Sequence, residues 1–157
     1  MPLHKKYRDN LREAADFQDF VTDTLMHCKK VLIGVYQSRH YQFAHGESFT
    51  GVEIKFDRKF RLTGNLYIET SERHSAEAEW KDAGIYHKAD PWLIVIGDYR
   101  EFWAIATQTL RNIHDRHLYK EVENASKTGR GFLLPVKKAD KERAFKWEAD
   151  CGTHAQH

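Results

Sequence analysis

The sequence predicts a mixed α/β domain, and three features of its residue pattern lead to that prediction. An amphipathic segment of helical period lies near the start, two later segments are almost wholly apolar, and two others alternate apolar and polar residues. Amphipathic helices bury one face on a sheet, covered strands are apolar throughout, and half-buried strands alternate. The predicted order is α-β-β-β-α-β followed by C-terminal helices, around a mixed central sheet that begins as a meander.

The first helix is expected from about Asp9 to Lys30. Its apolar residues recur at intervals of three and four, which places them on one face of a helix. Charged residues occupy the opposite side, and two lysines at the end suit the negative C-terminal end of the helix dipole. The apolar positions are Ala14, Phe17, Val21, Leu25 and Cys28.

Three strands are expected next. The first is rich in β-branched residues and typical of a strand covered on both faces, whereas the second and third alternate and are typical of half-buried strands. A turn with glycine at its centre joins the second strand to the third. The predicted strands are Val31–Tyr36, Gly51–Asp57 and Asn65–Ser71, and the turn is Thr63–Asn65.

The C-terminal half predicts a second set of elements and no internal repeat or linker. We expect residues 1–150 to form one domain and residues 151–157 to form a disordered tail. The predicted elements are a short helix at Ser75–Ala83 ended by Gly84, a central apolar strand at Pro91–Gly97, a helix from Arg100 to about His117, a short strand or loop at Gly131–Pro135, and a charged helix at Ala139–Trp147.

Composition narrows the class of protein. The 157 residues suffice for one domain with a hydrophobic core, and 25 Lys and Arg against 23 Asp and Glu give a net charge of +2. That charge neither favours nor excludes nucleic acid as a partner.

The longest apolar run, Trp92–Gly97, is too short to span a membrane, and the polar start lacks the features of a signal peptide. The two cysteines, Cys28 and Cys151, allow one disulfide but favour two free thiols in a reducing compartment, so we expect a soluble, cytoplasmic protein with no membrane partner.

The polar face of the Gly51–Asp57 strand indicates a functional site. Glu53, Lys55 and Asp57 share that face, and Glu69 comes sixteen positions after Glu53. If the two strands pair as a hairpin, Glu69 lies opposite either Glu53 or Asp57, and two acids so placed repel each other. A divalent cation would relieve that repulsion. Two or three carboxylates are a common protein contribution to a Mg²⁺ site, and with a lysine they suit phosphodiester hydrolysis.

These residues resemble the PD-(D/E)xK, or restriction-endonuclease-like, nuclease superfamily. Glu53-x-Lys55 is similar to the second half of the family motif, and the predicted element order is similar to the family core. The phrases Gly-Glu-Ser-x-x-Gly-Val-Glu-Ile-Lys-x-Asp and Thr-Gly-Asn-Leu-Tyr-Ile-Glu resemble uncharacterised members, many of them carried by phages and mobile elements. The resemblance covers about Asp9 to Gly97. It implies a Mg²⁺ (or Mn²⁺) cofactor, a DNA substrate and, as in many relatives, a homodimer.

Two assignments of the family motif remain open. In the first, Glu47 is the leading acid, and Glu53 with Lys55 forms the (D/E)-x-K. In the second, Glu53 leads and Glu69 is the second acid, so the family lysine falls at Ser71 and Lys55 replaces it from the neighbouring strand. The strand count favours the second assignment. Both retain Glu53 and Lys55.

The sequence therefore predicts a Mg²⁺-dependent nuclease that hydrolyses DNA. Metal ligands are expected among Glu53, Glu69, Asp57 and Glu47, and Lys55 is expected to activate water or to stabilise the transition state. The basic turn Arg58, Lys59 and Arg61 is expected to contact the nucleic-acid backbone. In the second assignment the family lysine is replaced by Ser71. This replacement permits an alternative function, a catalytically inactive module of the same fold that binds nucleic acid.

Overall fold

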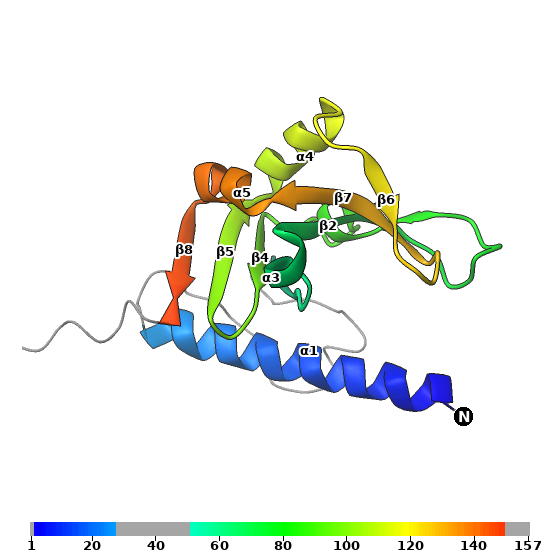
Figure 1. Ribbon diagram of the computed structural model, residues 1–157, viewed down its shortest axis with the longest axis horizontal. Coiled ribbons are helices and arrows are strands. Elements are labelled where there is room, and N and C mark those ends of the chain that lie inside the picture. Colours follow the sequence, from blue (N-terminus) through cyan, green and yellow to red (C-terminus); the bar gives the residue numbers. More distant parts are fainter. Residues whose placement is uncertain (1, 28–50, 150–157) are drawn as a thin grey trace, which may run out of the picture.

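The computed structural model describes residues 2–27 and 51–149, which form a mixed α/β structure with two sheets (Figure 1). The helices among these residues are α1 (Pro2–His27), α3 (Phe60–Thr63), α4 (Thr107–Asp115) and α5 (Val136–Glu142), with a 3-10 turn η1 (Gly84–Tyr86). The strands are β1 (Val52–Phe56), β2 (Asn65–Glu72), β3 (Lys81–Asp82), β4 (Leu93–Gly97), β5 (Glu101–Ala106), β6 (Glu121–Glu123), β7 (Gly129–Pro135) and β8 (Phe145–Glu148).

The strands divide into two four-stranded sheets. The first sheet has the order β1-β4-β5-β8, in which β1 pairs with β4 in parallel and the other neighbours are antiparallel. The second sheet has the order β3-β2-β7-β6 and is antiparallel throughout. The mixed α/β class predicted from the sequence is therefore confirmed.

Helix α1 covers one face of the first sheet (Figure 1). Phe17, Val21 and Leu25 are buried against Val52 and Ile54 of β1, so the even-numbered side chains of β1 face the helix. The predicted amphipathic helix is confirmed, although it begins at Pro2 rather than near Asp9. In the added part of the helix, residues 5–8 are exposed, so they are not part of the buried apolar face from which the prediction was made.

A second core lies between the other face of the first sheet and the second sheet. Ile94 and Ile96 of β4 pack there with the even-numbered residues of β2, and α4 and α5 close this core from the side opposite α1 (Figure 1). Because side chains alternate along a strand, the odd-numbered residues of β1 point toward the second sheet. Glu53 and Lys55 are those residues, so the fold places them where the two sheets adjoin.

The predicted hairpin between Gly51–Asp57 and Asn65–Ser71 is wrong, although both strands are confirmed as β1 and β2. The two strands belong to different sheets, and β1 takes β4 as its parallel partner. The connection folds into α3 because Phe60 is buried in the core between the sheets, and Gly64 ends that helix in the left-handed conformation. The first predicted strand, Val31–Tyr36, lies outside the described residues, as does the predicted tail at 151–157.

The predicted helix at Ser75–Ala83 is wrong. This segment consists of turns followed by β3, and Gly84 begins η1 instead of ending a helix. The guanidinium groups of Arg73 and Arg130 each lie over the Trp80 ring, 4.1 Å from its centroid. Arg130 belongs to β7 and is distant from Trp80 in the sequence. Helix propensity depends on the local sequence alone and does not include such contacts.

Two further predicted helices are shorter than expected and share their segments with strands. Arg100–His117 contains β5 before α4, because Phe102–Ile105 are buried in succession in the interior of the first sheet, between β4 and β8. Ala139–Trp147 contains the end of α5 and then β8, in which Phe145 and Trp147 alternate with Lys146. The apolar strand at Pro91–Gly97 and the strand at Gly131–Pro135 are confirmed as β4 and β7.

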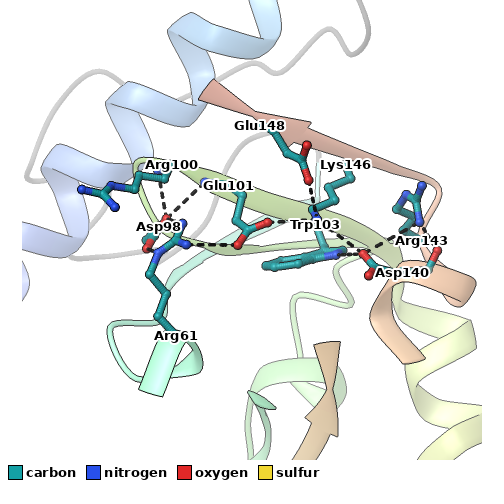
Figure 2. Close-up of polar contacts among 9 residues, drawn as sticks. All are labelled: Arg61, Asp98, Arg100, Glu101, Trp103, Asp140, Arg143, Lys146 and Glu148. Carbon is teal, nitrogen blue, oxygen red and sulfur yellow. Dashed lines mark hydrogen bonds and ion pairs between the residues drawn. The ribbon is translucent and has the colours of Figure 1, made fainter. Parts of the chain in front are cut away.

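A network of ion pairs joins β8 to β5 and α5, and joins α3 to the first sheet (Figure 2). The Nζ atom of Lys146 lies 2.6 Å from Glu148, 2.9 Å from Glu101 and 3.5 Å from Asp140. Burial alone lowers the pKa of Lys146, but the hydrogen bonds and charges of these acids outweigh it and raise that pKa to about 12. Arg61 of α3 joins the network through Asp98 and Glu101.

We expect Phe17→Ala to lower the free energy of unfolding by about 3–5 kcal/mol, since the ring is fully buried and its loss leaves a cavity. The Phe17 ring stacks on the Phe56 ring, with the two centroids 4.9 Å apart, and the alanine variant loses this contact as well. Urea titration measures the change. Asp19→Ala, on the exposed side of the same helix, is the control and should change stability by less than about 0.5 kcal/mol. Equal stability of the two variants would contradict the docking of α1.

We expect Lys146→Met to lower the free energy of unfolding near neutral pH by about 1 kcal/mol, because the ion pairs remain in contact with solvent. The folded pKa of Lys146, about 12, lies above the unfolded value of 10.5, so its contribution is complete below about pH 10 and is lost as the pH rises toward 12. The difference between wild type and variant in urea titrations should therefore shrink above about pH 10.5. A difference that grows with pH would contradict this assignment.

Candidate active site

Strand β1 and strand β2 bring two acids and one lysine together at the seam between the sheets. The Nζ atom of Lys55 lies 2.6 Å from Oε1 of Glu53 and donates a hydrogen bond of 3.3 Å to Oε2 of Glu69. Glu53 and Lys55 are two residues apart on β1 and so share a face, while Glu69 comes from the neighbouring sheet. Three of the residues predicted to form the site therefore meet, although the strands do not pair as predicted.

Glu53 is a buried acid with an unfilled hydrogen-bonding position. Its side chain is only 7% exposed, and Oε1 is bound to Lys55. Its other carboxylate oxygen, Oε2, is buried and has no hydrogen-bond partner within the part of the chain that the structure describes. A buried carboxylate oxygen left unpaired costs more than about 1–3 kcal/mol of folding free energy, so this atom marks a place where a donor or a cation is expected.

Lys55 is held as a cation by its two neighbours. Burial alone lowers the pKa of the Lys55 ammonium, but the charges of Glu53 and Glu69 and their hydrogen bonds outweigh burial and raise that pKa well above its ordinary value. The Lys55 side chain as a whole is 43% exposed, while its ammonium group contacts both acids. At neutral pH Lys55 is a fixed positive charge.

Asp57, the third predicted acid on this strand, binds backbone groups. Its Oδ1 accepts hydrogen bonds from the N–H groups of Lys59 and Phe60, at 2.8 and 3.1 Å, and its Oδ2 accepts one from Tyr67 at 2.9 Å. The first two bonds fix the start of α3 and the third ties the end of β1 to β2. Asp57 thereby holds the two site-bearing strands in their relative position.

The basic turn predicted to contact nucleic acid is partly engaged in ion pairs. Arg58 pairs with Glu13 of α1 and also donates to Asn10 at 3.3 Å. Arg61 belongs to the network of Figure 2 and pairs with Asp98 and Glu101. Lys59 is exposed at the start of α3.

Glu69 is the second acid that the structure brings to Lys55, whereas the alternative, Glu47, lies outside the described residues. Within residues 2–27 and 51–149 no group of three or more His, Cys, Asp or Glu side chains gathers as a metal site. Two carboxylates still fit Mg²⁺, which keeps several waters and uses one or two carboxylates together with substrate phosphates. The unpaired Oε2 of Glu53 is the atom that such an ion would satisfy.

Tyr67 is a neighbour of Glu69 on β2 that the motif did not include. It lies two positions before Glu69 on β2 and so shares its face, a relation already visible in the alternating sequence. Its hydroxyl is buried without a hydrogen-bond partner in the described part of the chain. Burial, followed by the charge of Glu69, raises the pKa of Tyr67 to about 12, while the charge of Lys55 acts in the opposite direction. The phenol is therefore neutral near pH 7.

No family model, curated protein or solved structure matches this chain. No helix in the described ranges is long and apolar enough to cross a membrane. The geometry of the site therefore carries the functional argument.

We expect Lys55→Met to lower the free energy of unfolding by about 2–3 kcal/mol, because it leaves the buried carboxylate of Glu53 without its counter-charge. The double variant Glu53→Gln/Lys55→Met removes both charges and should recover most of that loss. Urea titration at neutral pH measures each variant. Lys59→Met, an exposed lysine four residues along the chain, is the control and should be neutral. If Lys55→Met is as stable as Lys59→Met, the ion pair does not support Glu53.

Proposed function

We propose that this protein is a Mg²⁺-dependent nuclease that hydrolyses DNA phosphodiester bonds at the seam between its two sheets. The observation that carries the proposal is the meeting of Glu53, Lys55 and Glu69, in which one buried carboxylate oxygen has no described protein partner. Buried charges are normally paired on all sides, and an acid left partly unpaired beside a second acid and a lysine suits a site that takes a cation and an anion together.

The two glutamates are the proposed metal ligands. The free Oε2 of Glu53 faces no described donor, and Glu69 offers its carboxylate from the opposite sheet. Because these acids come from two rigid strands, their separation depends on the packing of the sheets rather than on a loop. Mg²⁺, when bound, supplies a Lewis acid that polarises the phosphoryl oxygen and lowers the pKa of bound water.

Lys55 is the proposed stabiliser of negative charge. A lysine that acts as a general base must lose its proton near neutral pH, and the two glutamates hold the Lys55 pKa above its ordinary range. A protonated amine instead stabilises the charge that develops on the phosphoryl oxygens as the bond to the nucleophile forms. Of the two roles expected for Lys55 from the sequence, the geometry favours this one.

The restriction-endonuclease-like assignment belongs to this proposal. An acid-x-lysine strand beside a second acidic strand, with a long helix packed on the first sheet, supports it. In this protein the two acidic strands belong to separate sheets, so the likeness rests on the meeting of side chains and not on a shared hairpin. The proposed partner is DNA in the cytoplasm, with a homodimer as the form that cuts both strands.

The proposal is tested with wild type and three variants on plasmid and oligonucleotide duplexes in Mg²⁺ or Mn²⁺. We expect wild type to cleave, and Glu53→Gln, Glu69→Gln and Lys55→Met to lose at least about a hundredfold in rate. Glu72→Gln is the matched control, because this exposed acid lies on the same strand as Glu69, and it should cleave as wild type does. Chelation of the metal should abolish cleavage.

Two results would count against the proposal in different ways. Binding of duplex DNA without cleavage in either metal would favour the catalytically inactive module of the same fold. Cleavage that persists in Glu53→Gln and Glu69→Gln would show that the seam is not the active site. Circular dichroism of each variant separates loss of activity from loss of folding.

A further inference from the structure

Helix α1 has an outer face that points away from the rest of the described structure. Phe17, Val21 and Leu25 bury its inner face against the first sheet, and the sheets and other helices of the described part lie on that side (Figure 1). On the outer side, six charged residues follow one another at intervals of three or four, so they line a single face. We call this row the charged stripe, and all six residues are exposed: Lys5, Arg8, Arg12, Asp16, Asp19 and Asp23.

The signs along the charged stripe are segregated. The first three residues are cations and the last three are acids, so all neighbours along the stripe repel each other except Arg12 and Asp16. Like charges at this spacing destabilise an isolated helix. The helix dipole also favours acids near the start and cations near the end, whereas this face has the reverse order and the first turn of α1 has no acid. The order of charges therefore does not serve the helix by itself.

The same order of charges is complementary to itself. A second copy of α1 that lies antiparallel and is centred on Ala14 places each cation within one residue of an acid of the copy. A parallel copy would instead bring like charges together. The facing pairs in the antiparallel arrangement are Lys5 with Asp23, Arg8 with Asp19, and Arg12 with Asp16, and a two-fold axis repeats each of them.

The shape of the stripe also suits a second helix. Intervals of three and four are those at which one helix contacts another along its length. From Lys5 to Asp23 the stripe extends over about 27 Å of helix. Ala15 lies beside the centre of the arrangement, and its small side chain allows two helices to approach each other there.

We propose that α1 is a dimerisation surface, through which two copies of this chain pack antiparallel about a two-fold axis. The proposed function gives a homodimer as the form that cuts both strands, and this inference rests on that function in this respect and names the interface. Exposed ion pairs are individually weak and are screened by salt, so the dimer should be of modest affinity and should dissociate as salt is added.

The test uses two charge-reversed variants of the full chain, studied by sedimentation velocity without DNA or metal. Lys5→Glu/Arg8→Glu/Arg12→Glu makes the whole stripe acidic, and Asp16→Lys/Asp19→Lys/Asp23→Lys makes it basic. We expect wild type to dimerise at low salt, with a dissociation constant that rises at least about tenfold at ~0.5 M salt. Each variant by itself should be a monomer.

Mixing the two variants is the decisive measurement. An acidic stripe and a basic stripe attract each other, so the mixture should form a one-to-one heterodimer at low salt. A variant with all six charges reversed should dimerise as wild type does, because the pattern is again self-complementary. An unfolded variant could give neither result, so recovery in the mixture separates a lost interface from a lost fold.

Lys120→Glu/Lys137→Glu/Lys141→Glu is the matched control. It reverses three exposed cations outside α1, so it has the same net charge as the acidic-stripe variant, and it should dimerise as wild type does. Loss of the dimer in this control would show that net charge and not the stripe decides association, and would overturn the inference.

Three other results would also overturn it. These are a wild type that stays monomeric at low salt, a mixture that contains only monomers, and an acidic-stripe variant that remains a dimer and loses only affinity for DNA. The last result would assign the basic half of the stripe to nucleic acid. A wild type that dimerises through the stripe but does not cleave DNA would overturn the proposed function alone, and one that cleaves as a monomer would overturn only this inference.

Discussion

The structure depends on how it accommodates one buried acid, Glu53. A carboxylate at this depth is stable only if its charge is balanced nearby, and Lys55, two residues along the same strand, supplies that balance. Among the described residues β1 is the last strand of the first sheet, and the Lys55 side chain as a whole is 43% exposed. The ammonium group of Lys55 also contacts Glu69, so one positive charge balances acids from both sheets.

The seam between the sheets is held partly by Asp57, which the sequence predicted to be a metal ligand, and by Arg61, which it predicted to contact nucleic acid. Asp57 binds three backbone N–H groups and Arg61 pairs with Asp98 and Glu101, so both fix α3 between β1 and β2. An acid or an arginine close to a site can therefore hold the reactive groups in position without being one of them. The separation of Glu53 from Glu69 depends on this framework, because the two strands share no ladder of hydrogen bonds.

The sequence predicted a helix or strand correctly where the pattern of buried and exposed residues along that element was clear. The amphipathic period of α1, the alternation in β1 and β2, and the apolar run of β4 each correspond to a burial pattern in the fold. It failed where distant contacts decide, as in β5, whose apolar residues also fit a helical period but lie between two strands of a sheet. Strand pairing was missed for the same reason, since the partner of β1 is a strand some forty residues away rather than the next one.

The prediction that Glu53, Lys55 and Glu69 meet names the right residues for a wrong reason. Glu53 and Lys55 share a face because they are two residues apart on β1, whereas Glu69 meets them through the packing of a separate sheet. What the sequence could not supply is the state of individual atoms, such as the buried Oε2 of Glu53, which has no hydrogen-bond partner among residues 2–27 and 51–149. The protein alone carries a charge of −1 on its two glutamates and one lysine, a divalent cation brings this to +1, and one phosphodiester brings it to zero. A seam that is neutral only with both ligands present selects for the pair, which is the condition that metal-dependent phosphodiester hydrolysis requires.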